Sequence, residues 1–467
     1  MDKESKTAAK KRTGKQLLTG ILLCFSVFLP VFISACSVRI YDLQPIIVGT
    51  DTATPTTQTK ETFAAVTPSP AIRSATATPP IHISPTEITE PISVNILDIA
   101  MIDGGTGWGI GQIPGKSDKM VLRTGDGAAT WKNITPPEAI YDQAGKIRDI
   151  AYCFRDELHA WLMFYAPDGS FSSEELRVWS TEDGGQTWES SPLPLAGYGI
   201  QFFTSPQIGF LDSQTGWLFA HIGKTANREY IALYTTYDGG RNWNAMVTSD
   251  SGNLSSLGRK NGAVFRDTLE GWISSQNTAE EPDMILWHTM DGGNTWFKQP
   301  VPAPYGYNIP DGLLIDPSYT CRFSTPKFTD TMYQCAWAVL RCAKQDAGEP
   351  VSILYWTQDR LVSWKTLRLP AFDGDLSFYG IEYGWYAVST TPGSDFPYEI
   401  LFTEDGGENW RTASRLAWDS RLQFITPAVG FGIATYNGQP ALVKTMNSGF
   451  SWEQIFPIVT SDQRNSR

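Results

Sequence analysis

The chain has 467 residues, including 41 glycines and 30 prolines, and 12% of its residues are aromatic whereas only 18% are charged. Short strands joined by tight turns fit this composition better than long surface helices, which need more Glu, Lys and Ala. The net charge of −12 argues against a nucleic-acid partner, because neutralising phosphates requires a basic face.

The N-terminus has the features of an export signal. Six Lys and Arg residues between positions 3 and 15 precede an apolar run from Leu17 to Ala35. A run of 19 residues is also long enough for a membrane-spanning helix, although Pro30 and the small residues at its end favour cleavage. The string Ile33-Ser34-Ala35-Cys36 resembles the bacterial lipoprotein cleavage box, which implies removal of residues 1–35 and a lipid on the Cys36 thiol. We therefore expect a chain that is lipid-anchored to a bacterial membrane outside the cytoplasm.

Residues 36–92 are expected to form a disordered tether. Positions 50–92 contain 12 Thr and 7 Pro residues. Such a segment cannot bury enough apolar surface to offset the entropy lost on ordering it. We interpret it as a spacer and not as a binding site.

Two motif series, each with seven members, follow the tether. The first series, here called the turn motifs, is typified by TEDGGQTW at 181–188, and each member begins with Thr and ends with Trp. A small residue followed by an aromatic residue forms the second series, which runs from Gly107-Trp108 to Gly430-Phe431 upstream of the first. The acidic or amide positions of the turn motifs are Asp126, Asp183, Asp238, Asp291, Asp359, Asp405 and Asn447, and the closing tryptophans are Trp131, Trp188, Trp243, Trp296, Trp364, Trp410 and Trp452.

Each repeat divides into four short β-rich runs, A to D, bounded by Gly, Asp or Pro. Four-stranded units repeated without helical segments are typical of β-propeller blades. The sequence therefore predicts an all-β, seven-bladed β-propeller of four-stranded antiparallel blades over residues 93–467. The blades are expected at about 93–136, 147–193, 200–248, 260–300, 318–369, 374–413 and 420–458. Because run A of the first unit begins the domain and run D of the seventh ends it, no strand exchange is expected to seal the ring.

The turn motifs resemble the bacterial neuraminidase repeat, or Asp-box, which in that family forms the hairpin between strands C and D. Together with the small–aromatic pairs, they more closely resemble the propellers of the photosystem II stability and assembly factor family, a resemblance that covers residues 93–467. It implies structural aspartates and a non-catalytic binding platform for other membrane proteins. The strongly acidic chain gives no reason to expect the photosynthetic partner itself.

In a propeller, the A–B and C–D turns lie on one rim, here called the turn rim, and the B–C and D–A loops lie on the other, here called the loop rim. The turns are nearly constant in length whereas the loops vary, and variable loops are where function is usually found. We therefore expect the binding face on the loop rim.

The largest insertion, residues 297–327, carries Tyr305 and Tyr307 among prolines. It predicts either an amphipathic contact surface or a stiff loop that only covers a blade edge. The B–C loops add acidic residues that are either solvated surface or a site for a cation or a basic partner: Glu174, Glu175, Glu280, Glu281, Asp283, Asp346, Glu349 and Asp395.

The cysteines predict one disulfide. Cys321 is placed before strand A of unit five and Cys342 after strand B, so an oxidising exterior would allow them to pair. Cys153 and Cys335 are expected to be buried thiols, with a bridge from Cys335 to a neighbour in its own blade left open. The sequence has no C-x-x-C, and its four His residues are dispersed, so no metal site and no cofactor are expected.

Two classes of function remain open at this stage. The first is a tethered, non-catalytic binding or assembly platform for a protein or glycan, bound through the lipid on Cys36 to the membrane. The alternative is a sialidase-like glycoside hydrolase or a carbohydrate-binding propeller. The Phe-Arg-Asp strings at 154–156 and 265–267 resemble a sialidase motif only superficially, because they occupy ordinary strand-A positions of the repeat. No catalytic residue is predicted.

Overall fold

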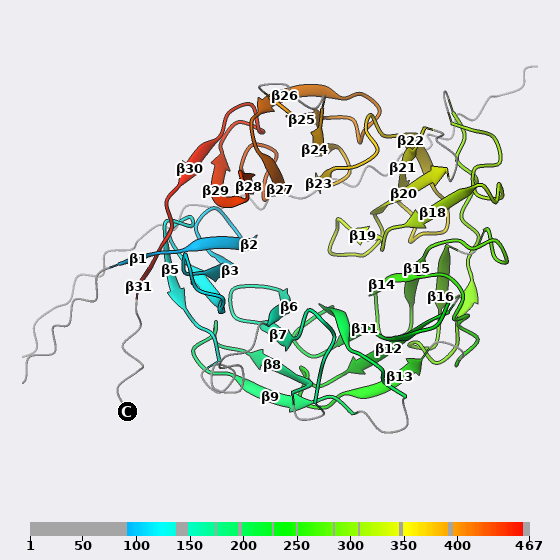
Figure 1. Ribbon diagram of the computed structural model, residues 1–467, viewed down its shortest axis with the longest axis horizontal. Coiled ribbons are helices and arrows are strands. Elements are labelled where there is room, and N and C mark those ends of the chain that lie inside the picture. The colour runs from blue at the N-terminus through cyan, green and yellow to red at the C-terminus, as the bar shows by residue number, and fades with distance from the viewer. Residues whose placement is uncertain are drawn as a thin grey trace, which may run out of the picture. The chain divides into compact units, whose positions relative to one another are not determined.

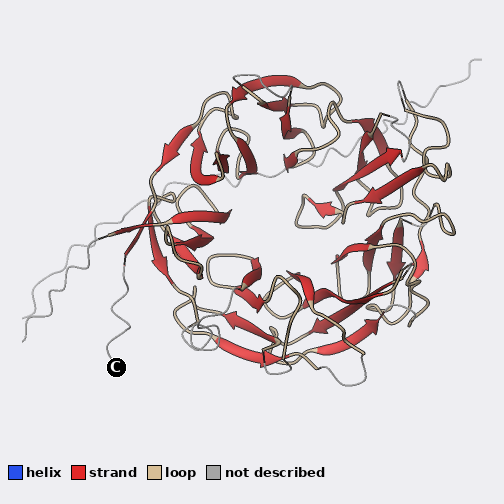
Figure 2. Ribbon diagram, viewed as in Figure 1, coloured by secondary structure: helices blue, strands red, loops and turns tan. Residues whose placement is uncertain are grey.

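The computed structural model of the protein describes residues 91–136, 148–172, 175–194, 199–226, 228–248, 251–283, 285–306, 309–344, 349–390 and 396–460. This part of the chain is made of strands, turns and loops and contains no helix (Figure 2). The described residues therefore include no helix that is long and apolar enough to cross a membrane.

Seven antiparallel sheets surround a central axis, which confirms the predicted seven-bladed β-propeller (Figure 1). In the second and sixth blades, for example, Figure 1 shows the first strand nearer the axis than the fourth. Blades one to four contain β2 (Asn95–Met101), β3 (Gly107–Gln112), β4 (Lys119–Thr124) and β5 (Thr130–Asn133); β6 (Asp149–Phe154), β7 (Ala160–Tyr165), β8 (Arg177–Thr181) and β9 (Glu189–Pro192); β10 (Thr204–Phe210), β11 (Gly216–Lys224), β12 (Glu229–Thr236) and β13 (Asn244–Thr248); and β14 (Lys260–Phe265), β15 (Gly271–Ser275), β16 (Leu286–Thr289) and β17 (Phe297–Lys298).

Blade five has a fifth strand because its inner strand is interrupted. The segments β18 (Tyr319–Phe323) and β19 (Lys327–Phe328) both pair with β20 (Ala336–Lys344), and Pro326 lies in the break between them. The other strands of the last three blades are β21 (Val351–Thr357) and β22 (Lys365–Arg368); β23 (Asp375–Tyr379), β24 (Tyr383–Ser389), β25 (Tyr398–Thr403) and β26 (Arg411–Leu416); and β27 (Asp419–Phe424), β28 (Gly430–Tyr436), β29 (Gln439–Thr445) and β30 (Glu453–Ile455).

Aromatic stacking between neighbouring blades explains the spacing of the small–aromatic pairs. Trp385 on β24 stacks on Phe424 of the next blade with ring centroids 3.5 Å apart, and Trp161 on β7 stacks on Phe210 in the same way. A Cβ on Gly384, which precedes Trp385, would lie 2.3 Å from the Phe378 ring, so only a very small residue fits there. Gly384 therefore leaves room for the Phe378 ring of its own blade, while Trp385 and Trp161 stack against the next blade.

The ring is sealed by strand exchange, so the expectation of a seal without it was wrong. β31 (Ile458–Thr460) follows the seventh blade and pairs in parallel with β5 of blade one. β1 (Ile92–Ser93) then pairs antiparallel with β31 on its other side (Figure 1). Val459 is buried with Trp131 and Val94, which places apolar contacts as well as backbone hydrogen bonds across the closure.

Candidate functional site

The seven turn motifs are C–D corners that share one hydrogen-bond pattern. In the sixth motif, Thr403 Oγ1 donates to Asp405 Oδ1 at 2.7 Å, and the Asn409 backbone N–H donates to the same oxygen at 2.9 Å. The Gly407 N–H donates to Thr403 Oγ1 at 3.0 Å, and both motif glycines have positive φ (71° and 93°). The corresponding threonine-to-aspartate or threonine-to-asparagine bonds occur in all seven motifs. These side chains close turns within their own blades.

The closing tryptophans pack into the blades at the same corners. Trp131 and Trp296 are fully buried, and each donates its indole N–H to a backbone carbonyl of its own motif, at 2.9 and 3.0 Å. Trp243 is also buried, whereas Trp188, Trp364, Trp410 and Trp452 are partly buried against the same apolar clusters. No motif aspartate lines either of the two hollows described below.

The charge of Asp405 has a measurable consequence for stability. The Asn409 backbone N–H, the largest influence, lowers the pKa of Asp405 from 3.8 to about 2. A carboxyl whose folded pKa is depressed stabilises the fold fully above its unfolded pKa and loses this contribution as the pH falls through the folded value. The stabilisation by Asp405 is therefore present at pH 5 and above and is lost progressively between pH 4 and pH 2.

We expect Asp405→Asn to lower the free energy of unfolding by about 1 kcal/mol at pH 7. The new amide N–H₂ would face Asn409 Nδ2, which now donates to Asp405 Oδ2 at 2.8 Å. In the natural seventh motif, by contrast, Asn447 Nδ2 donates to Ser451 Oγ at 2.9 Å. The double variant Asp405→Asn/Asn409→Ser should therefore recover part of the loss. Urea unfolding at pH 7, 5 and 3 measures these differences, and a deficit that does not shrink toward pH 3 would contradict the assignment.

A second series of turn-forming side chains was not identified as such from the sequence. Asp267 Oδ1 accepts the backbone N–H groups of Leu269 and Glu270 at 2.9 and 2.7 Å, and this closes the A–B turn of blade four. Asp103, Asp156, Asp212 and Asp330 each accept two backbone N–H groups in the equivalent turns. The signal was an aspartate two residues after the strand-A aromatic or Met. In each of the two Phe-Arg-Asp strings, the Phe is the last residue of strand A and the Asp closes the A–B turn, which agrees with their interpretation as ordinary strand-A positions.

The structure places a disulfide between Cys321 and Cys342. Both residues lie inside strands, directly opposite each other on β18 and β20, and not before and after the strands as expected. Cys335 is buried and has no disulfide bond. Cys153, on the inner strand β6, is intermediate in exposure as a residue and packs against an apolar cluster, and burial raises the pKa of its thiol.

The large insertion is anchored to blades four and five. Leu313 and Leu314 are buried in the apolar cluster shared by these blades, and Tyr355 Oη donates to the Pro302 carbonyl at 2.9 Å. Tyr305 is 82% exposed and Tyr307 lies outside the described residues, as does Cys36. The insertion therefore covers a blade edge, and Tyr305 does not line either hollow.

Three described acidic residues of the B–C loops pair with separate basic side chains in different blades. Glu175 pairs with Arg148 at 3.0 Å, Glu281 with Lys298 at 3.0 Å and Glu349 with Arg368 at 3.9 Å. Glu174, Asp346 and Asp395 lie outside the described residues. Among the residues that the structure describes, no group of three or more His, Cys, Asp or Glu could hold a metal ion.

A hollow of about 500 Å³ opens on the loop rim between blades three and four, with one residue from blade five. It lies between the β11–β12 connection, the segment before β14 and the end of β15, so it is formed largely by the variable loops. Its charged and polar lining residues are Lys224, Thr225, Arg228, Glu229, Arg259, Gln276, Asn277, Thr278, Glu280 and Thr320. Of these residues, only Glu280 was singled out from the sequence, because the others belong to no repeat and carry no motif.

Buried polar residues fix the walls of this hollow. Lys260 is fully buried, and its Nζ donates to the Leu257 carbonyl at 2.6 Å, while its backbone N–H donates to Glu229 Oε2 at 2.8 Å. Asn277 is buried, and its Oδ1 accepts the Cys321 backbone N–H at 2.8 Å. Every wall is therefore tied to a neighbouring blade or loop, which keeps the site preformed.

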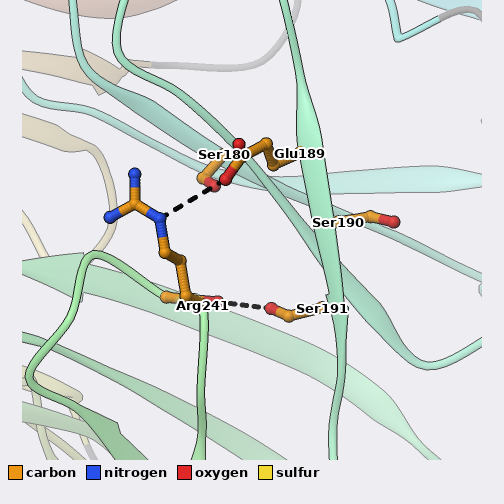
Figure 3. A pocket seen from close by; sticks show the side chains of 6 residues that line it. Ser180, Glu189, Ser190, Ser191 and Arg241 are labelled. Atoms are coloured by element: carbon orange, nitrogen blue, oxygen red, sulfur yellow. Dashed lines mark hydrogen bonds and ion pairs between the residues drawn. The ribbon is translucent and has the colours of Figure 1, made fainter.

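A second hollow, of about 470 Å³, lies between blades two and three. Figure 3 shows Arg241 pointing toward Glu189, with Nε 3.4 Å from the carboxylate, while Arg241 Nη2 lies 2.8 Å from Glu182. Ser191 donates to the Gly240 carbonyl across the same gap. Because the charged groups here pair with one another and join the two blades, this hollow is the weaker candidate.

A third polar group lines the inner strands of blades six, seven, one and two. Arg421 lies 3.3 Å from Asp98, and Asp375 Oδ2 accepts the Leu422 backbone N–H at 2.7 Å. Burial raises the pKa of Asp375 above its usual value, and burial together with Asp98 raises the pKa of Tyr152. The contacts of Asp98 and Asp375 cross from one blade to the next, so they hold adjacent blades together.

No protein-family model and no curated protein matches the chain. A solved ulvan lyase of a polysaccharide-lyase family is similar to it at 13% identity, covering 79% of this chain and 96% of that chain with a TM-score of 0.44. The GH93 alpha-L-arabinofuranosidase of Fusarium graminearum, solved with arabinobiose, is 13% identical over 63% of this chain and 91% of its own, with a TM-score of 0.37. The fucose-specific lectin from Aleuria aurantia is 10% identical over 80% of this chain and 100% of its own, with a TM-score of 0.34. At these identities and scores the likeness carries no argument about function.

Proposed function

We propose that the protein is a membrane-tethered, extracytoplasmic and non-catalytic binding platform that takes a glycan on its loop rim. The observation that carries this proposal is the preformed polar hollow between blades three and four, which lies opposite the turn motifs. The export signal, the cleavage box at Cys36 and the Thr/Pro-rich segment support a propeller held outside the cytoplasm by a lipid and a spacer. The resemblance of the repeats to assembly-factor propellers supports a platform over an enzyme.

The lining of the hollow favours a glycan over an apolar ligand. Hydroxyl groups of Thr225, Thr278 and Thr320 and the amide of Gln276 alternate with charged side chains, whereas Leu257 is the one large aliphatic residue in the lining. Hydroxyl-rich ligands require many convergent donors and acceptors, and a lining of this kind supplies both. The size of the hollow, about 500 Å³, lies within the usual range for small-ligand sites.

Filling the hollow should abolish glycan capture. Ala279 is exposed and lines the hollow, so Ala279→Trp would occupy it without disturbing the core. We expect the full-length protein to bind members of a glycan array and Ala279→Trp to lose at least about tenfold in affinity. The matched control is Ala428→Trp, an exposed alanine in the A–B turn of blade seven on the opposite rim. Absence of glycan binding, or equal binding by both variants, would overturn the proposal.

A further inference from the structure

We propose that the loop-rim hollow contains a subsite for an oxyanion, a carboxylate or sulfate group carried by the glycan, held by Arg259 in its lining and by Arg322, which lies outside the lining but is bridged to the lining residue Gln276. This inference rests on the proposed glycan-binding function and specifies the chemical class of the ligand. Lys224 lines the same hollow and would receive a further anionic group of the polymer.

The backbone brings the two arginines together from different blades. The Gln276 backbone N–H donates to the Arg259 carbonyl at 2.8 Å, and Gln276 also forms an isolated antiparallel bridge with Arg322. Arg341 lies directly opposite Arg322 on the neighbouring strand β20. Arg259, Arg322 and Arg341 therefore follow one another in space, from the segment before β14 of blade four to β18 and β20 of blade five.

Arg322 is held in a defined orientation. Its Nε donates to Asn261 Oδ1 at 2.7 Å, and the Nδ2 of this buried asparagine donates to the Phe323 carbonyl at 2.8 Å. Arg322 as a whole is exposed on β18. A guanidinium fixed through Nε is preorganised to bind an oxyanion through its remaining donors.

The lining of the hollow carries three basic side chains, Lys224, Arg228 and Arg259, and two acidic ones, Glu229 and Glu280. Across the described part of the chain, neither Arg259 nor Arg322 has a carboxylate within ion-pair distance. Glu229, the nearest candidate, is engaged by His221 at 3.1 Å and by the Lys260 backbone N–H. Burial, Arg259 and Arg341 together lower the pKa of Arg322, because like charges and desolvation disfavour its protonated form. An oxyanion would relieve this repulsion, on a chain whose net charge is −12.

The test compares ligands that share one polysaccharide backbone and differ in charge. Full-length protein is titrated with dextran, carboxymethyl dextran and dextran sulfate, and with polyglutamate and inorganic sulfate as other sources of the same oxyanions. We expect both charged dextrans to bind at least about tenfold more tightly than dextran, and Arg259→Gln to remove about tenfold of that affinity. Arg360→Gln removes the same charge from an exposed position in the turn motif of blade five and should change nothing. A thermal unfolding curve for each variant checks that it is folded.

Each contrary result has a separate meaning. Equal affinities of Arg259→Gln and Arg360→Gln, or no gain from charge on the dextran, would overturn the oxyanion subsite. If the array still shows glycan binding that Ala279→Trp abolishes, the proposed function survives that failure. Tighter binding of polyglutamate or of inorganic sulfate than of the charged dextrans would overturn a saccharide as the carrier of the anion.

Discussion

Val459→Asp is expected to lower the free energy of unfolding by about 4 kcal/mol. Val459 lies on β31, the strand that seals the ring, and only 6% of it is exposed. Removing the buried valine side chain lowers the free energy of unfolding by about 2 kcal/mol. Placing a polar group among apolar neighbours lowers it by about a further 2 kcal/mol. These neighbours include Trp131 and Val94 from blade one, so the loss acts directly on the closure.

The adjacent residue supplies the control. Thr460 is exposed at the end of the same strand and loses only the hydrogen bond from its hydroxyl to the Trp131 carbonyl, so Thr460→Asp should lower the free energy of unfolding by at most about 1 kcal/mol. Urea unfolding followed by tryptophan fluorescence measures both variants, since the chain has 17 tryptophans distributed round the ring. If Val459→Asp proved as stable as Thr460→Asp, β31 would not be the strand that closes the propeller.

Removing the Cys321–Cys342 disulfide is expected to cost about 3 kcal/mol, as for other loops of about this length. The bond links β18 to β20, 21 residues apart in the chain, and clamps the interrupted inner strand of blade five. Both sulfurs are fully buried, so the double variant Cys321→Ala/Cys342→Ala leaves no polar group without a partner.

Treatment with a reductant measures the contribution of the same disulfide to thermal stability independently. Dithiothreitol should lower the melting temperature of the natural protein and of Cys153→Ala by equal amounts, but should leave the double alanine variant unchanged. A natural protein that keeps its full stability under reducing conditions during unfolding would contradict the assigned role of the bond.

The fold could be predicted because the residues that make contacts between blades recur at the same positions in each repeat. Trp385 and Phe424 belong to different units, yet each unit repeats both positions, so the two motif series report the stacking indirectly. The seal could not be predicted in this way. β31 has only three residues, belongs to no repeat and pairs in parallel with a strand at the other end of the propeller. Pairing between segments so distant in the chain leaves no periodic signal.

The candidate site was predicted only as a face. The variable loop lengths indicated the loop rim. Tyr305 was proposed as a contact residue because it is an aromatic residue among prolines, but it does not line the hollow. Arg259 and Arg322 meet because Gln276 pairs with both, and this junction between blades follows no spacing rule. A usable signal was nonetheless present: several basic residues stand in the variable connections of an otherwise acidic chain.

Because β1 pairs with β31, the fold does not require the ends of the propeller to lie between blades seven and one. Ile92 lies opposite Val459, so the two ends of the propeller are already neighbours. A circularly permuted chain, joined at this point and opened in another connection, would keep every blade, every corner and the contacts of each small–aromatic pair. The order in which the blades are translated is therefore separable from the order in which they pack.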